Sequence, residues 1–168
     1  MNAKEKQVEF VKSYLKPKLK EEGFSTSRLT WWKNKGDFFI VINLQNSLYN
    51  SKNELSFCFN IGVAITELIN DPFKKEATYY DIVTNLRESA YLSKNRTKHK
   101  YRQDGWLGYL ITDETDLIEF TDELRKDFEI DILPKLYQLN TLEDCLKFYQ
   151  RFDFWGENLK KVLEKLEK

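Results

Sequence analysis

The chain has 168 residues and a formal net charge of zero, because 27 basic side chains balance 27 acidic ones. This balance excludes overall electrostatic attraction to nucleic acid or to an anionic membrane as the basis of function. Aromatic residues make up 15% of the chain, enough to build the core of the single domain expected for residues 1–168.

An amphipathic helix is predicted at the start of the chain, over residues of about 3 to 22. Its apolar positions are Val8, Val11, Leu15 and Leu19. Gly23 is expected to end the helix, since glycine tolerates the left-handed backbone that follows a helix. Pro17 lies inside it and is expected to bend or restart the helix there.

The next segment, STSRLTWWK at residues 25–33, is predicted to be one strand. Neighbouring strand residues point to opposite faces, so Trp31 and Trp32 are expected on opposite sides of the sheet. The segment NKGD that follows predicts a turn, in which Gly36 can supply a positive φ.

The clearest pattern is a hairpin that pairs residues 38–45 with residues 55–63. In both segments an apolar row alternates with a second row, which includes the neutral polar residues Asn43, Gln45, Ser56 and Asn60. If Gln45 lies opposite Ser56, then Leu44 lies opposite Phe57, and the two apolar rows share one face of the sheet.

Two further strands are predicted, in residues 77–89 and residues 105–112. The acidic run DETD at 113–116 is then expected to begin a helix, where carboxylates meet unpaired N–H groups. The apolar stripe of that helix is Leu117, Phe120, Leu124, Phe128 and Ile132. Pro134 is expected to break it.

Two more helices are expected near the end of the chain. Thr141 and Asp144 have the spacing of a capping box, and a last helix carries apolar residues from Leu159 to Leu166. The order of elements predicts an α+β fold, with a five-stranded antiparallel β-meander, an N-terminal helix and about three C-terminal helices. The helices are expected on one face of the sheet.

The sequence also predicts a soluble cytoplasmic protein. The first residues, MNAKEKQVEF, lack the apolar segment of a signal peptide, and no stretch is apolar enough to cross a membrane. Cys58 and Cys145 have no metal-binding or redox spacing, so we expect buried thiols in a reducing compartment.

Three segments together resemble one known family. They are LKPKLKEEGF at 15–24, VINLQNS at 41–47 and FCFNIGV at 57–63. In this order and spacing they are similar to the family called domain of unknown function 4304. The matching residues are Leu15, Pro17, Leu19, Lys20, Gly23, Phe24, Gln45, Ser47, Phe57, Asn60 and Gly62.

The resemblance extends to about residue 148 and implies the fold but no reaction. It departs from the family at residues 79–93, where relatives tend to carry a basic strand and this chain has only Arg87. The resemblance implies a small bacterial cytoplasmic protein, for which a role in binding another protein, including an immunity-type role, is an expectation.

The polar face of the hairpin is the leading candidate site. Its residues are Gln45, Ser47, Ser56 and Asn60. Their amides and hydroxyls could present fixed donors and acceptors to a partner protein. The alternative is that helices cover this face and the amides bond to loops or to one another.

The second candidate is the basic segment KNRTKHKYRQ, residues 94–103. Arg96, Lys98, Lys100 and Arg102 could neutralise phosphates while Tyr101 stacks on a base, which would make the protein a nucleic-acid binder. The alternative is a solvated loop between strands.

Enzymatic chemistry is not expected. His99 is the single histidine and has no partner at ligand spacing, and the acids of DETD are better explained by a helix start. The six glycines form no phosphate-binding loop. We therefore expect no cofactor, no metal site and no catalytic residue.

Overall fold

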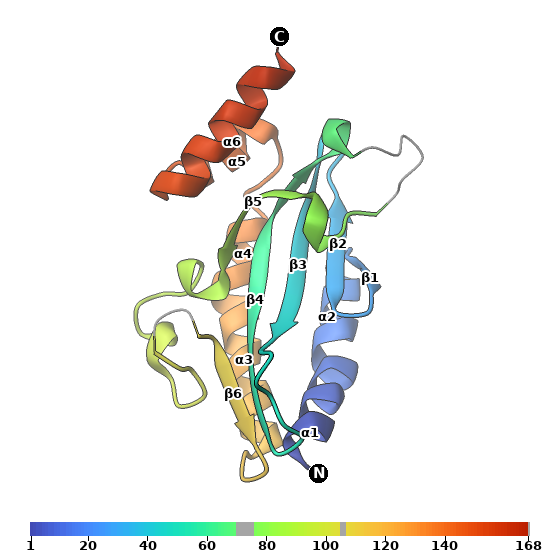
Figure 1. Ribbon diagram of the computed structural model, residues 1–168, viewed down its shortest axis with the longest axis vertical. Coiled ribbons are helices and arrows are strands. Elements are labelled where there is room, and N and C mark those ends of the chain that lie inside the picture. The colour runs from blue at the N-terminus through green and yellow to red at the C-terminus, as the bar shows by residue number, and fades with distance from the viewer. Residues whose placement is uncertain (70–75, 105–106, 168) are drawn as a thin grey trace.

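A computed structural model describes residues 1–69, 76–104 and 107–167 (Figure 1). In these residues an antiparallel sheet has the strand order β1-β2-β3-β4-β5, and β6 also pairs with β4. The strands are β1 (Ser25–Ser27), β2 (Thr30–Asn34), β3 (Phe38–Asn46), β4 (Glu54–Ile65), β5 (Ile82–Arg87) and β6 (Tyr109–Thr112).

The helices lie behind the sheet and beyond one end of it (Figure 1). They are α1 (Ala3–Phe10), α2 (Lys16–Glu21), α3 (Leu117–Lys126), α4 (Leu133–Leu136), α5 (Leu142–Tyr149) and α6 (Asp153–Leu166). Figure 1 shows α3 and α4 behind the sheet, and α5 and α6 near its upper end. The predicted α+β class and antiparallel sheet are confirmed.

Side chains cap two of these helices as the sequence predicts. The Asp116 carboxylate accepts hydrogen bonds from the N–H groups of Ile118 and Glu119, at 3.0 and 3.1 Å, and so begins α3. Thr141 and Asp144 form a capping box at the start of α5. Both caps satisfy backbone donors that have no partner inside the helix.

Each proline inside a helix follows a π-helical turn. The first helix runs from α1 through a π-helical segment, Val11–Leu15, into α2, where Pro17 lies in the first turn, and it ends before Gly23 with φ +92°. The second runs from α3 through Asp127–Ile132 into α4. The prediction that Pro134 breaks this helix is wrong, because the wider turn accommodates a residue that lacks an N–H.

The predicted first strand is in fact a tight hairpin. Arg28 has a φ of 56°, a left-handed conformation that reverses the chain between β1 and β2. The prediction of one continuous strand over residues 25–33 is therefore wrong. Trp31 and Trp32 do pack on opposite faces, in two separate apolar clusters, as expected.

The predicted pairing of β3 with β4 is confirmed, but its register differs by two residues. Gln45 lies opposite Cys58, not Ser56, and Leu44 lies opposite Phe59. A shift of two keeps every side chain on its expected face, since strand side chains alternate with a period of two.

The last two strands share one edge of β4. The segment 77–89 contributes β5, whose extended part begins at Ile82 after a 3₁₀ turn. Residues 105 and 106 of the predicted fifth strand lie outside the described residues, and β6 begins at Tyr109. It pairs with the first part of β4, opposite residues 54–57, so the meander ends at β5.

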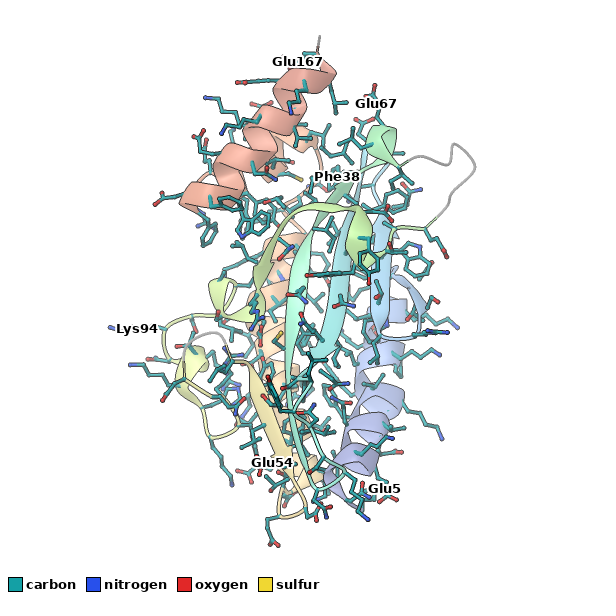
Figure 2. All side chains as sticks on the ribbon, viewed as in Figure 1. Glu5, Phe38, Glu54, Glu67, Lys94 and Glu167 are labelled. Carbon is teal, nitrogen blue, oxygen red and sulfur yellow. The ribbon has the colours of Figure 1, made fainter. Side chains whose placement is uncertain are left out.

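The main core fills the space between the sheet and the helices (Figure 2). Phe59 on β4 and Phe128 behind it pack edge to face, with ring centres 5.0 Å apart. The opposite face of the sheet carries a smaller cluster of Trp32, Phe39, Val41, Ala64 and Ala77. Polar residues continue along the rest of that face, which we call the open face.

Candidate functional site

A hollow of about 490 Å³ lies on the open face, at the end where the β3–β4 hairpin turns. Its lining is Gln45, Asn46, Ser47, Leu48, Tyr49, Ser56, Phe57, Cys58, Arg87 and Leu107. Three of the four predicted binding residues, Gln45, Ser47 and Ser56, therefore come together in one place. The fourth, Asn60, does not line it.

A row of side-chain amides crosses the sheet and ends at this hollow. Asn43 donates to the Thr30 hydroxyl at 2.9 Å. Asn60 is buried and donates to the Gln45 side-chain oxygen at 2.8 Å and to Asn43 at 3.3 Å. Gln45 is exposed, so its NH₂ group is presented at the end of a row that fixes its orientation.

The loop above the hollow is held by its own side chains. The Asn50 amide accepts from the Ser56 N–H at 2.7 Å and donates to the Ser56 carbonyl at 2.9 Å, as a neighbouring strand would. Ser47 accepts from the Tyr49 N–H at 3.2 Å, and the Ser56 hydroxyl donates to Gln103. Ser47 and Ser56 thus order the site through bonds of their own.

The rim of the hollow is apolar. Leu48 and Tyr49 are 96% and 95% exposed, and Leu107 is 54% exposed. Arg87 is the charged member of the described lining. Desolvation raises the pKa of the Cys58 thiol to about 11, so this thiol is neutral at physiological pH.

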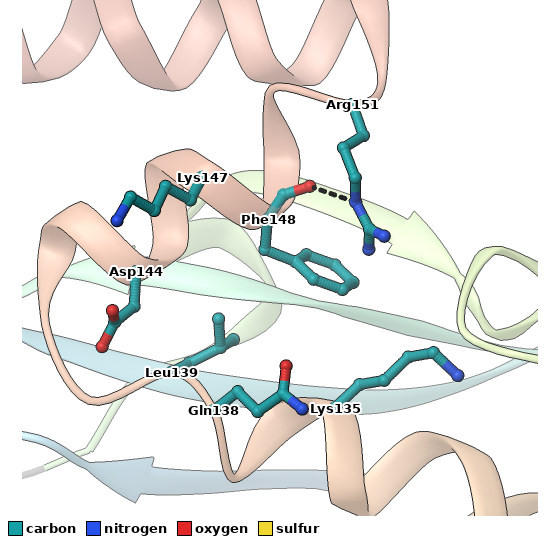
Figure 3. A pocket seen from close by; sticks show the side chains of 7 residues that line it. All are labelled: Lys135, Gln138, Leu139, Asp144, Lys147, Phe148 and Arg151. Atoms are coloured by element: carbon teal, nitrogen blue, oxygen red, sulfur yellow. Dashed lines mark hydrogen bonds between the residues drawn. The ribbon is translucent and has the colours of Figure 1, made fainter.

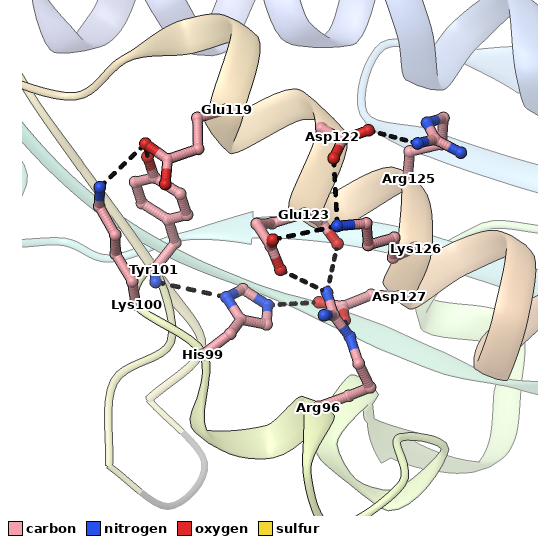
Figure 4. A network of polar contacts seen from close by, with 10 residues as sticks. All are labelled: Arg96, His99, Lys100, Tyr101, Glu119, Asp122, Glu123, Arg125, Lys126 and Asp127. Carbon is pink, nitrogen blue, oxygen red and sulfur yellow. Dashed lines mark hydrogen bonds and ion pairs between the residues drawn. The ribbon is translucent and has the colours of Figure 1, made fainter.

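The basic segment does not form the solvated loop that its sequence suggests. The Arg102 side chain is only 1% exposed and pairs with Glu88. Arg96 pairs with Glu123 and Asp127, and Lys100 with Glu119 (Figure 4). Of the four residues predicted to contact nucleic acid, Arg102 is therefore enclosed, and Arg96 and Lys100 are paired with acidic side chains.

Asp127 is a buried acceptor shared by three side chains, two of which, Arg96 and His99, are drawn in Figure 4. Arg96 Nε donates to one carboxylate oxygen, and the Tyr109 hydroxyl donates to the other, both at 2.8 Å. His99 Nε2 also lies 2.8 Å from Asp127. His99 Nδ1 accepts from the Tyr101 N–H, so Nε2 carries the proton directed at Asp127.

Glu88 and Arg102 form a second buried pair in the gap between β5 and β6. Glu88 accepts from Arg102 Nη1 at 2.9 Å and from the Phe59 N–H at 3.3 Å. Burial raises the pKa of Glu88, although Arg102 opposes this shift. Among the described residues, Arg102 Nε and Nη2 have no hydrogen-bond partner, and the guanidinium lies over the Tyr109 ring.

These two networks anchor the segment 88–102 to β4 and to the helix that contains Asp127. Sequence reasoning missed both acids, because Glu88 ends a predicted strand and Asp127 adjoins an apolar stripe. The sequence around Glu88 or Asp127 does not indicate which distant residue pairs with it.

Three further observations concern the chemistry of the described residues. They contain no group of three or more His, Cys, Asp or Glu residues placed to hold a metal ion. Both cysteines are free and buried, and desolvation raises the pKa of Cys145 to about 12. None of their helices is long and apolar enough to cross a membrane.

A model of the family described as domain of unknown function (DUF4304) matches residues 15–138. This range includes the hollow and both buried networks. No curated protein and no solved structure matches the chain.

Proposed function

The chain belongs to the DUF4304 family, whose description assigns no activity, and we propose that it is a non-enzymatic module that binds another protein through the open-face hollow. The observation that carries this proposal is the pair Leu48 and Tyr49, almost fully exposed beside a hollow with a polar floor. Large exposed apolar side chains around a recess are typical of protein–protein interfaces.

The ordered state of the loop supports this role. Because Asn50 holds the loop against β4, the backbone that carries Leu48 and Tyr49 is held in place. A partner would therefore meet a preorganised surface, which lowers the entropy cost of association. Tyrosine suits such a position, since it offers a large contact area with few rotatable bonds.

The floor defines the chemistry of the partner segment. Gln45 presents its NH₂ group, and Arg87 adds a cationic side chain to the lining. Both groups bind carbonyl or carboxylate oxygens. The partner is a polypeptide segment that places an acidic side chain or a backbone carbonyl on the floor and apolar side chains against the rim.

The chemistry of the potential nucleophiles supports the non-enzymatic part of the proposal. The raised pKa values of Cys58 and Cys145 keep both thiols protonated at neutral pH, which makes them weak nucleophiles. The ring of His99 is held between Tyr101 and Asp127. Two buried free thiols also fit the cytoplasmic location that we propose.

Nucleic-acid binding through residues 94–102 is the rival function. Its strongest remaining residue is Lys98, which is exposed. If Lys98→Glu with Lys100→Glu lowered a salt-dependent affinity for nucleic acid, this function would replace the one proposed here.

Site-specific crosslinking in the native host tests the proposal. A photo-reactive amino acid replaces Tyr49 in one variant and Tyr80 in the control, since Tyr80 is 93% exposed elsewhere. We expect a defined protein to crosslink at position 49 and not at position 80. Crosslinks at both positions, at neither, or to nucleic acid would contradict the proposal. A toxin gene next to the coding gene would support an immunity-type role.

A further inference from the structure

A groove of about 580 Å³ lies between α5, α6 and the short turn Thr66–Leu68, and we call it the α5–α6 groove. Figure 2 labels Glu67 of that turn and Glu167 at the end of α6, both at the upper end of the molecule. The groove shares no lining residue with the open-face hollow. Except for Glu67, its lining follows residue 138, where the match to the family model ends.

The apolar stripe of α6 continues past the core that it packs against. Leu159 on this stripe is completely buried, whereas Leu163 and Leu166 are only half-buried and line the groove. Figure 1 shows the last part of α6 beyond the end of the sheet. These two leucines therefore offer apolar surface that the fold itself does not cover.

α5 adds a second pair of half-buried leucines. Its buried face carries Cys145 and Tyr149, while Leu142 and Leu146, one turn apart, line the groove. Because all four leucines of the floor remain partly exposed, the groove is a trough and not an enclosed site that would bury most of a small molecule. Its shape suits the apolar face of a polypeptide.

The rim of the groove is acidic. One base, Lys160, and four exposed acids line it, namely Glu67, Glu143, Glu164 and Glu167. Within the part of the chain that the structure describes, none of these four acids has an ion-pair partner. Since the whole chain has as many bases as acids, this excess of acids is a local feature.

The bases of the same region lie on a different side of α5. Lys135, Lys147 and Arg151 line a pocket of about 440 Å³ between α4 and α5 (Figure 3). Figure 3 shows Lys135 and Lys147 pointing to opposite sides, so these bases do not converge on one ligand. Neither they nor Arg151 line the α5–α6 groove, and its acidic rim is left without their charge.

We propose that the α5–α6 groove binds a basic amphipathic helix of another protein. The apolar face of such a helix packs on the four leucines, and lysines or arginines beside that face meet the glutamates of the rim. Two helices present rows of side chains rather than a strand edge, so a third helix fits between them. The charge of the rim disfavours nucleic acid and anionic membranes. A symmetric pair of copies would bring one acidic rim against another.

Three synthetic peptides test the groove by fluorescence anisotropy with the intact protein. The first forms a helix with leucines on one face and lysines on the other. The second replaces its lysines by glutamates, and the third has the same composition in an order that spreads the leucines around the helix. We expect saturable binding of the first peptide and affinities at least about tenfold lower for the other two. Equal binding of the first and third peptides, or no binding of the first, would overturn the proposal.

Variants of the protein locate the contact. Glu164→Lys reverses an exposed charge of the rim, and Glu157→Lys makes the same change at an exposed position of α6 outside the lining. We expect Glu164→Lys to weaken the first peptide at least about tenfold and Glu157→Lys less than about threefold. Tyr49→Ser, at the open-face hollow, should leave this affinity unchanged, so the two surfaces are tested separately. Equal losses for the two charge reversals would indicate diffuse attraction and contradict the proposal.

Sedimentation of the protein alone tests the competing occupant, a second copy of the chain. We expect a monomer. A dimer that Leu163→Asp converts to a monomer, with unchanged circular dichroism, would assign the groove to self-association and overturn the proposed partner.

Discussion

Glu88 and Arg102, which lie on opposite sides of the gap between β5 and β6, form a hydrogen-bonded ion pair of 2.9 Å with almost no exposure to solvent. The pair lies beside the part of β4 between its pairings with β5 and β6, and Glu88 satisfies the Phe59 N–H there. Such a pair costs desolvation energy, so its net contribution to stability differs from the cost of breaking it.

A double-mutant cycle on this pair should be strongly non-additive. Arg102→Met leaves a buried carboxylate without its cation and should cost about 3–5 kcal/mol of unfolding free energy. Adding Glu88→Gln should recover more than about 1 kcal/mol, because the amide still accepts from Phe59 and no buried charge remains. Urea titration at pH 7 measures all four proteins. Additive losses would show that the two side chains do not interact.

The pH dependence of stability should report the raised pKa of Glu88. An acid with a folded pKa above its unfolded value of about 4.3 binds more protons in the native state between those two values. The unfolding free energy should therefore fall as pH rises through this window, by up to about 1.4 kcal/mol per pH unit. Glu88→Gln should reduce this slope, whereas Glu54→Gln at an exposed position should not. Parallel curves for all three proteins would contradict the assignment.

Removing the Asp127 carboxylate should destabilise the protein more than removing any one of its three donors. Asp127→Ala leaves Arg96, His99 and Tyr109 without their shared carboxylate and should cost about 3–5 kcal/mol. Tyr109→Phe removes one donor and should cost about 1–2 kcal/mol. Tyr101→Phe, which removes a bond to exposed Glu119, is the matched control and should cost less. Chemical denaturation ranks the variants, and equal losses for the two tyrosines would be inconsistent with a buried hub.

The amide row predicts that its two ends behave differently. Asn60→Ala removes a buried donor and should cost about 1 kcal/mol or more. Gln45→Ala changes an exposed side chain and should lower the unfolding free energy by less than about 0.5 kcal/mol. It should also weaken binding of the partner identified by crosslinking. Denaturant titration and a binding assay together distinguish a residue that stabilises the fold from one that contacts the partner. A large stability loss for Gln45→Ala would remove it from the binding surface.

Alanine should destabilise the protein at two glycines, for different physical reasons. At Gly62 a Cβ would overlap the Thr84 carbonyl oxygen and lie 2.7 Å from the Asn85 Cα, so β4 and β5 would have to separate. Gly62→Ala should cost about 3 kcal/mol. At Gly36 the space is open but φ is +92°, so Gly36→Ala should cost about 1–2 kcal/mol from backbone strain. Thermal denaturation of both variants checks the order.

Alternation along the chain was sufficient to predict β3, β4 and the face that each side chain occupies. It could not define their register, because Gln45 opposite Ser56 and Gln45 opposite Cys58 satisfy the same pattern. The turn at Arg28 was missed, since a positive φ at a residue other than glycine has no clear signal in the sequence. The pairing of β6 with β4 depends on contacts between distant segments.

The candidate site was predictable to the extent that it follows one hairpin. Gln45, Ser47 and Ser56 were identified from their neutral polar character, and they line one hollow. Arg87 and Leu107 reach it from other segments, so a local pattern could not indicate them. The basic loop was misjudged at Arg102, because the acid that pairs with it lies before the loop and is buried with it.

The position of β4 between three strands has a consequence for the order of folding. Pairing of β3 with β4 needs only a short loop to close. Pairing of β6 with β4 places Thr112 opposite Glu54, and more than fifty residues separate them in the chain. During synthesis the first part of β4, which carries Leu55 and Phe57, therefore waits with an unpaired edge until Tyr109–Thr112 has left the ribosome. Unpaired apolar edges are where nascent chains aggregate, so slow translation between these strands should lower the yield of native protein.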